Sequence, residues 1–292
     1  MRLEEKLKKI GPPDRKAMAL AEARWRSVAK PLHSLGVLEK DIVKIAGMTG
    51  DPKVSLEKKA LVIMCADNGI VEEGVTQTGQ EVTAVVTENF THGNACSCIM
   101  ADMAGTDVFP VDIGVASPLE NCGNRHPLIR RKIRFGTDDF CRGPAMTREE
   151  AEQAVMAGIA IAEELKEKGY GIIATGEMGI GNTTTSSAVV SVLLDTRPEQ
   201  VTGRGAGLSD QGLAKKVQVI REGIRRNQPD KEDGLDVLSK VGGLDLAGLA
   251  GIYLGGALCH MPVVADGFIS GAAALAARAL CPYAADYMVA SH

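Results

Sequence analysis

The residues best placed to do chemistry lie in the stretch 170–190, which reads YGIIATGEMGIGNTTTSSAVV. It begins with a short apolar run of the kind that forms a buried parallel strand. Gly176, Gly179 and Gly181 then predict a loop, and Asn182 with the three threonines after it predicts the cap of a helix. Backbone N–H groups and the helix dipole both favour negative charge at such a turn, so the stretch predicts an anion site.

Glu177 lies inside this predicted loop, where a simple phosphate cradle would avoid a carboxylate. Its presence indicates a site that also binds hydroxyl groups, binds a cation or moves a proton. The spacing fits neither the P-loop, because no lysine follows the last glycine, nor the strict G-x-G-x-x-G fingerprint. A strand-to-helix turn without a ligand is the alternative, and the density of glycines favours a ligand.

A second glycine-rich loop, GRGAG at 203–207, precedes a predicted helix over 209–226. Lys215 and Lys216 fall in the first two turns of that helix. They are either ordinary exposed helix residues, or one of them reaches a phosphate held at the Glu177 loop. The sequence leaves both interpretations open.

Acidic residues also lie at the ends of three predicted strands. They are Asp67, Asp112 and Asp266, in or after apolar runs at 59–66, 106–115 and 261–265. Because the carboxyl ends of parallel strands form one edge where ligands bind, these carboxylates and Glu177 favour an active site over four unrelated caps. No histidine joins them, so the pattern does not indicate a metal.

The polar loop 74–80 follows the strand at 59–66. Thr78 or Gln80 meets the start of a helix expected over 81–104, which makes the loop a simple cap. A loop beside the end of a strand is also well placed to contact a substrate, so both interpretations stay open.

The elements that must position these residues alternate along the chain. Strands separated by helices predict an α/β fold with a doubly wound, mainly parallel, Rossmann-like sheet and a small helical subdomain. Residues 1–50 are helical in pattern and form the predicted subdomain, and 51–292 form the predicted α/β domain. A capping box, Thr147 to Glu150, predicts the start of a further helix.

The amino-acid composition indicates which partners and which cellular compartment to expect. The 292 residues carry a net charge of −4 and only 3% aromatic side chains, which argues against a nucleic-acid surface. Seven scattered cysteines without a C-x-x-C pattern are typical of free thiols in a reducing compartment. With no signal peptide and no membrane segment in view, we expect a cytoplasmic protein.

Taken together, these motifs resemble the nicotinate-nucleotide:dimethylbenzimidazole phosphoribosyltransferase family, which assembles the lower ligand of cobalamin. The matching segments occur in order from about residue 10 over nearly the whole chain. They are ADNGI at 66–70, EGVT at 73–76, EVT at 81–83, NF at 89–90, VDIG at 111–114, GEMGIGNTT at 176–184, GLAKK at 212–216, KVGGLD at 240–245 and DGFIS at 266–270.

The resemblance implies transfer of the phosphoribosyl group of nicotinate mononucleotide to 5,6-dimethylbenzimidazole or a related azole. The products are nicotinate and α-ribazole 5′-phosphate, formed with inversion at the anomeric carbon. It further implies no cofactor and no metal, because a pyridinium leaving group needs neither, and a homodimer.

The resemblance and the two glycine loops together imply a set of substrate-binding residues. They are Asp67, Thr76, Gln80, Gly176, Met178, Gly179, Ile180, Gly181, Asn182, Thr183, Gly203, Gly205, Lys216 and Asp266. Glu177 is expected to orient the ribose or to act as the base. Family members usually continue past this sequence with a Gly-Glu-Gly-type motif whose glutamate is regarded as the base. A form that binds nucleotide and azole without efficient turnover is therefore the alternative function.

Overall fold

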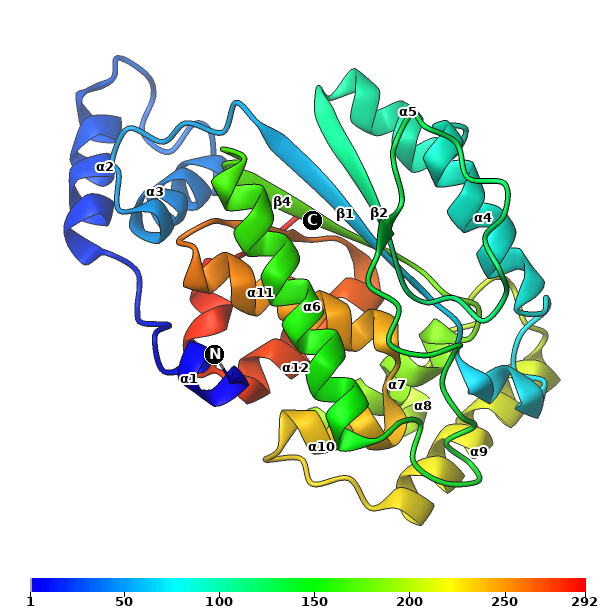
Figure 1. Cartoon of the computed structure of the whole chain (residues 1–292). Coiled ribbons are helices and arrows are strands. Elements are labelled where there is room, and N and C mark those ends of the chain that lie inside the picture. Colours follow the sequence, from blue (N-terminus) through cyan, green and yellow to red (C-terminus); the bar gives the residue numbers. More distant parts are fainter. Residues whose placement is uncertain (1) are drawn as a thin grey trace.

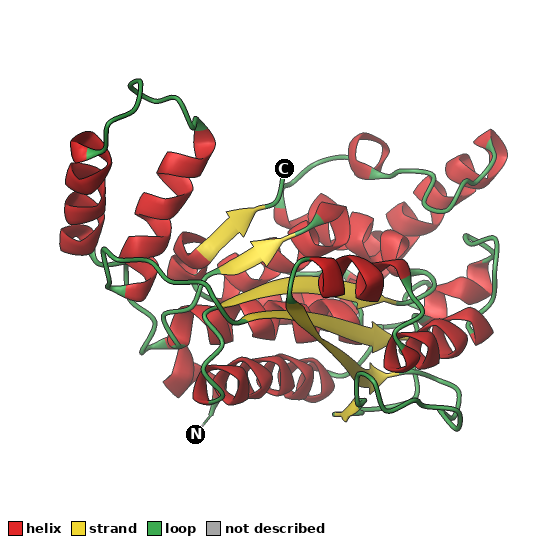
Figure 2. Ribbon diagram, turned by 90° about the horizontal axis from the view of Figure 1, so that it is seen from above, coloured by secondary structure: helices red, strands yellow, loops and turns green. Residues whose placement is uncertain are grey.

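Six parallel strands form a single sheet in the computed structural model, which describes residues 2–292 (Figures 1 and 2). They are β1 (Lys59–Ala66), β2 (Thr106–Gly114), β3 (Ile129–Arg130), β4 (Ile172–Met178), β5 (Val263–Ala265) and β6 (Met288–Ala290). The order β3-β2-β1-β4-β5-β6 runs outward in both directions from β1 and β4. The doubly wound sheet expected from the sequence is therefore confirmed, and its switch point lies between β1 and β4.

Helices cover both faces of this sheet because side chains of β1 point alternately to two apolar clusters. Ile63 and Cys65 pack with α4 (Glu81–His92) and α5 (Cys96–Met103) on one face. Val62 and Met64 pack on the other face, in the larger cluster. The helices of that cluster are α6 (Arg148–Glu167), α7 (Asn182–Leu193), α9 (Asp210–Asn227), α10 (Gly234–Val241), α11 (Leu244–Leu258) and α12 (Gly267–Leu280). Figure 1 shows α4 and α5 on the opposite side of β1 and β2 from α6 and α11.

Residues 2–50 are mainly helical, as their pattern predicts. They contain α1 (Leu3–Leu7), α2 (Arg15–Ser27) and α3 (Val37–Thr49). The helices α2 and α3 pack against each other and project from one end of the sheet (Figures 1 and 2). Both ends of this segment also contact the main body: Ile45 and Met48 of α3 join the large core cluster, and the ammonium of Lys6 in α1 pairs with Glu163 of α6 at 2.5 Å. A boundary between two domains at residue 50 stays a prediction.

Three short elements complete the chain: α8 (Pro198–Val201) and the 3-10 helices η1 (Gly69–Glu73) and η2 (Pro282–Tyr287). No helix within residues 2–292 is long and apolar enough to cross a membrane. The predicted capping box is confirmed, since Thr147 Oγ1 accepts from the Glu150 N–H at 3.1 Å and the Glu150 carboxylate accepts from the Thr147 N–H at 2.9 Å.

Two local predictions were wrong. The continuous helix expected over 81–104 is two helices, because Gly93 adopts φ +78° and ends α4 before α5 begins. The loop expected at Gly176 is still strand, since β4 continues to Met178. Pairing of Glu177 with Met64 and of Met178 with Cys65 of β1 extends the strand, so Glu177 lies on the sheet and the turn starts at Gly179.

The helix α11 is buried along its whole length and packs tightly against α6. Glycines make the close approach possible: a Cβ on Gly158 of α6 would lie 2.1 Å from the carbonyl oxygen of Gly248, and a Cβ on Gly251 would lie 2.1 Å from that of Val155. Backbone therefore meets backbone at this contact, and a methyl group has no space.

We expect Gly251→Ala to lower the free energy of unfolding by about 1–3 kcal/mol, because the two helices must move apart. Gly271→Ala, inside α12, is the matched control. A Cβ at this position meets no atom within 4 Å, so a gain of about 0.5–1 kcal/mol is expected from the higher helix propensity of alanine. Urea unfolding of both variants measures the difference, and equal changes would contradict the role given to the glycine contact.

Candidate active site

The candidate site lies at the switch point, where β1 and β4 end and α7 begins. Gly181 turns the chain with φ +97°, and a Cβ there would lie 3.0 Å from Val71 and 3.2 Å from Asn68. The helix α7 starts directly afterwards at Asn182, whose side-chain amide donates to the Glu177 carboxylate. A glycine turn, a helix N-terminus and a carboxylate are thus brought together, as the sequence predicts.

The threonines after the turn do not cap the helix, contrary to expectation. Gly181 is the N-cap residue and makes no side-chain bond. Thr185 donates to the carbonyl of Asn182 at 3.0 Å, and Thr183 instead faces the second glycine loop. A residue without a side chain at the N-cap leaves the start of α7 open to an external anion.

Lys216 is the charged residue that reaches this corner. It comes from α9, is fully buried, and its ammonium donates to Thr183 Oγ1 at 2.8 Å and to the carbonyl of Gly203 at 3.3 Å. Burial lowers the pKa of Lys216 to about 8. Within the described residues 2–292, no carboxylate forms an ion pair with it. A buried cation without a counter-ion favours an anionic ligand.

A cavity of about 520 Å³ opens beside this lysine. Its lining residues are Thr183, Ser187, Gln200, Val201, Thr202, Gly203, Gly205 and Phe268. Gly205, with φ +56°, lets the loop approach, because a Cβ there would lie 3.1 Å from Thr183 Oγ1 and 3.6 Å from the ammonium of Lys216. The two glycine loops therefore form one site.

The other basic residues near the second loop point elsewhere. Arg204 binds the carboxylate of Asp210 and the carbonyl of Leu208. Lys215 is exposed, and its ammonium lies 3.2 Å from where a Cβ on Gly74 would be. Of the two lysines left open by the sequence, Lys216 is the one that faces the site.

The loop 74–80 contacts both halves of the site through glutamines. Gln80 donates to the carbonyl of Asn68 at 3.3 Å. Gln77, which the sequence did not single out, donates to the carbonyl of Gly207 at 2.7 Å. Thr76 bonds only within the loop, to the carbonyl of Thr78 at 2.9 Å. The loop is thus more than a helix cap.

Asp67 supports the site from behind. It is fully buried, and Oδ2 accepts from the N–H of Ala116 at 2.7 Å. Burial raises the pKa of Asp67, while a hydrogen bond from Thr83 lowers it. Thr83 Oγ1 in turn accepts from the N–H of Ile180 at 3.1 Å. Thr83 therefore holds the turn that contains Ile180, and Asp67 holds the chain at Ala116.

A second cavity, of about 350 Å³, lies against the sheet, and both Glu177 and Asp266 line it. Its lining is otherwise mainly apolar, with Leu61, Ile63 and Met100. Burial raises the pKa of Glu177, and the bond from Asn182 lowers it. Asp266 is exposed and accepts from the hydroxyl of Ser291 at 2.9 Å. The space suits a flat apolar group beside a carboxylate.

Asp112 has a different role from the other strand-end carboxylates. It forms an ion pair with Lys132 at 3.1 Å and accepts from the N–H of Val115 at 3.0 Å. These bonds hold the end of β2 and the following loop. No cluster of three or more His, Cys, Asp or Glu side chains suited to a metal occurs in the part of the chain that is described.

Sequence reasoning missed Asp245 and Asn68, both fully buried at this edge. The motif KVGGLD at 240–245 contains Asp245, the one charged residue of α11. A lone carboxylate at the start of an otherwise apolar helix is the signal that could have identified it. Asn68 directly follows Asp67 after β1.

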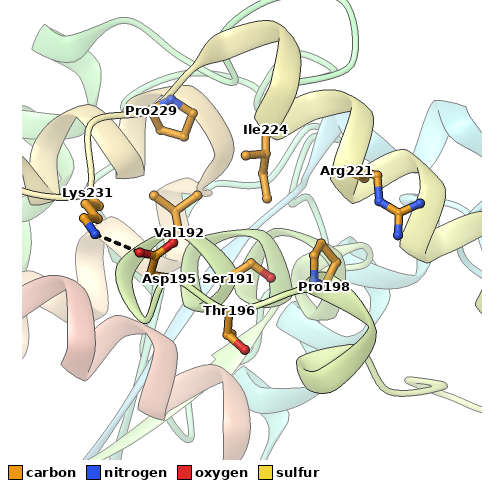
Figure 3. Close-up of a pocket in the computed structure, with 9 residues that line it drawn as sticks. All are labelled: Ser191, Val192, Asp195, Thr196, Pro198, Arg221, Ile224, Pro229 and Lys231. Carbon is orange, nitrogen blue, oxygen red and sulfur yellow. Dashed lines mark hydrogen bonds and ion pairs between the residues drawn. The ribbon is translucent and has the colours of Figure 1, made fainter.

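A further cavity, of about 300 Å³, lies at the other end of α7 (Figure 3). The ammonium of Lys231 pairs there with Asp195 at 2.9 Å. Arg221 pairs with Glu199, so both cations already have partners. None of the predicted site residues lines this cavity, which is therefore separate from the site.

Comparison with known proteins agrees with this geometry. The family model described as "Phosphoribosyltransferase" matches residues 10–292. The nicotinate-nucleotide–dimethylbenzimidazole phosphoribosyltransferase of Acetivibrio thermocellus is 48% identical over 290 residues, covering 99% of this chain and 82% of that protein. The enzyme of that name from Clostridium acetobutylicum is 45% identical over 292 residues, covering 100% of this chain and 82% of that protein.

Solved structures lead to the same family. The crystal structure of CobT from Thermus thermophilus superposes with a TM-score of 0.89 at 39% identity, covering 95% of this chain and 82% of that one. With the fold, the site and the relatives in agreement, the chain belongs to the nicotinate-nucleotide–dimethylbenzimidazole phosphoribosyltransferase family.

Proposed function

We propose that this chain transfers the phosphoribosyl group of nicotinate mononucleotide to 5,6-dimethylbenzimidazole or a related azole. Nicotinate leaves and α-ribazole 5′-phosphate forms, as a step of cobalamin biosynthesis. The observation that carries the proposal is the buried Lys216 between the two glycine loops, bonded to Thr183 and Gly203. The names of the relatives support the choice of substrates.

The phosphate is placed in this proposal at the start of α7. Lys216 and Thr183 meet there at 2.8 Å, and Gly203 and Gly205 present backbone beside them. The ammonium would exchange its bond to the neutral carbonyl of Gly203 for a bond to an anionic phosphate oxygen, which is the stronger because both partners are then charged. The N-terminus of α7 adds its dipole.

The ribose and the azole are then placed toward Glu177 and the apolar cavity against the sheet. A ring nitrogen of the azole attacks the anomeric carbon with its lone pair, and the bond to the pyridinium nitrogen breaks. Positive charge develops on the ribose in between, and a nearby carboxylate stabilises it. The azole N–H proton leaves to a base.

Two roles for Glu177 are distinguishable. It either orients the ribose hydroxyls, which we favour because Asn182 holds its carboxylate, or it accepts the azole proton. Gly176, Met178 and Gly179 belong to the same strand end and turn and complete the proposed wall. A homodimer and a cytoplasmic location stay part of the proposal.

The test is release of nicotinate by the purified chain. We expect release only when nicotinate mononucleotide and the benzimidazole are both present. Glu177→Gln should lower kcat/KM by about 10- to 150-fold, the effect of losing a hydrogen bond to a charged group. Glu149→Gln, at an exposed position of α6, is the control and should match the unchanged chain.

The outcomes separate the candidate functions. If Glu177→Gln acts mainly through KM for the nucleotide, Glu177 orients the ribose. If the variant also loses the ascending limb of the pH profile of kcat, it is the base. Calorimetric binding of both substrates without any nicotinate release would favour the alternative, a form that binds without turnover.

A second prediction concerns Lys216. Lys216→Met should weaken binding of nicotinate mononucleotide by about 10- to 150-fold while the fold persists, since a buried charge is replaced by an apolar side chain. In the unchanged chain, affinity should fall as the pH rises through about 8, where Lys216 loses its proton, and the variant should lack this fall.

Lys215→Met is the matched control, since its exposed side chain is the next residue along the same helix. It should bind the nucleotide as the unchanged chain does. Equal losses in both variants would contradict a specific phosphate contact at Lys216. Calorimetric titration on both sides of the Lys216 pKa measures both effects.

A further inference from the structure

Asp245 is a buried carboxyl group that the proposed reaction has not yet used. It lies in the first turn of α11 and is completely buried. Burying an ionised carboxylate without a counter-charge is costly, so a structural role alone would be served better by an apolar residue. The position of Asp245 therefore calls for a specific explanation.

The side chains of Asp245 and Asn68 both lie against Gly243 and Gly179. Asp245 Oδ1 and Asn68 Oδ1 are each 2.4 Å from the point that a Cβ on Gly243 would occupy. Asp245 Oδ2 and Asn68 Nδ2 lie 2.8 and 3.0 Å from the corresponding point on Gly179. The two Oδ1 atoms thus both lie near Gly243, and Asn68 Nδ2 and Asp245 Oδ2 both lie near Gly179.

This arrangement lacks hydrogen-bond partners if Asp245 is ionised. Asn68 Nδ2, Asn68 Oδ1 and Asp245 Oδ2 are buried without a partner of normal geometry among the described residues. Asp245 Oδ1 accepts only the N–H of Leu246, at 2.9 Å. A proton on Asp245 Oδ1 changes this, because it lets that oxygen donate toward Asn68 Oδ1, an acceptor that otherwise has no partner in the described part of the chain.

The pair also reaches Glu177. Asn182, at the start of α7, donates to Glu177 and faces the Asp245 carboxyl with the same side chain. The backbone of Asn68 accepts from Gln80 of the loop 74–80. Asp245 therefore lies behind Asn182, the amide that holds Glu177, and behind Asn68 at the end of β1.

We propose that Asp245 is a positioning residue of the transfer site, which as a neutral carboxylic acid pairs with the Asn68 amide and holds Asn68 and Asn182 against Glu177. The inference rests on the proposed function for the part played by Glu177. It also makes a claim about the protonation of the folded chain that needs no substrate.

The groups around Asp245 favour the protonated, uncharged form of its carboxyl group. Burial, followed by the negative charge of Glu177 on β4, raises the pKa of Asp245 to about 7. The groups that face it from α7 and from the end of β1 are the uncharged amides of Asn182 and Asn68, which lower the pKa less. Ionisation of Asp245 therefore adds a negative charge beside the Glu177 carboxyl group.

The pH profile tests this role. In the unchanged chain, kcat should fall as the pH rises through about 7, because ionised Asp245 loses its bond to Asn68 Oδ1 and repels Glu177. Asp245→Asn is permanently neutral and keeps a donor toward Asn68, so its profile should lack this descending limb. Asp139→Asn is the control and should keep it, since the buried Asp139 instead contacts Arg142 and the N–H of Cys141.

Stability gives a second readout that does not depend on turnover. Between its ordinary pKa of 3.8 and about 7, the unfolded carboxyl loses its proton while the folded one keeps it. Unfolding is therefore favoured progressively as the pH rises through this window. Urea unfolding should show the unchanged chain losing stability relative to Asp245→Asn from about pH 4 to about pH 7, and a constant difference thereafter.

The results separate failure of this inference from failure of the proposed function. A stability difference that stays constant across the whole of this window would overturn the neutral carboxyl, whatever the enzyme does. A stability difference that follows the pH, combined with a descending limb that persists in Asp245→Asn, would overturn the positioning role. If the chain lacks turnover, the positioning role of Asp245 is tested by measuring the affinity for nicotinate mononucleotide at different pH values. Binding should then weaken as the pH rises through the pKa of Asp245 in the unchanged chain, beyond any weakening in Asp245→Asn.

Discussion

The contact between α11 and its two neighbours, α6 and the sheet, is the interaction on which the rest of the structure depends. Every residue of α11 up to Ala257 is buried, and its glycines let the backbone of α6 approach directly. On the other side, Gly248 meets Ile113 and Met64 of the central strands. A helix fixed between two layers in this way cannot slide or rotate without a clash.

Because α11 is fixed, the residues of its first turn are held in place below the candidate site. This turn lies at the carboxyl ends of β2, β1 and β4, where Leu244 approaches Gly114 of β2 and Asp245 lies against Gly179 after β4. The site is therefore built from a rigid core on one side and from two glycine loops on the other. The arrangement combines a buried cation, Lys216, with a carboxylate, Glu177, that is held by Asn182. It suits a substrate with an anionic end and a ribose that becomes cationic during the reaction.

Much of the fold could be predicted because its signals are local. Apolar runs of strand length separated by amphipathic helices predicted the parallel sheet, and the Thr147 capping box was correct because its bonds join neighbouring residues. The extension of β4 to Met178 could not be predicted, since it depends on pairing with the distant strand β1. The break at Gly93 was visible in the sequence but was outweighed by the helical pattern on both sides.

The residues of the candidate site likewise fall into two groups, those that local sequence patterns predicted and those that only the structure identified. The glycine loops and Glu177 were found because glycine density and helix starts are short-range patterns. The choice between Lys215 and Lys216 required the structure, because adjacent residues of α9 point in different directions. Asp245 was missed because its meaning comes from Asn68 and Asn182, which are distant in sequence and reach it only in the folded chain.

The most direct measurement is a crystal structure of this chain with nicotinate mononucleotide bound. The account predicts that the phosphate lies about 3 Å from the ammonium of Lys216 and from Thr183 Oγ1, with the ribose directed toward Glu177. A phosphate bound elsewhere, such as in the cavity beside Lys231 (Figure 3), would contradict it. So would a structure in which Lys216 keeps only its bonds to Thr183 and Gly203.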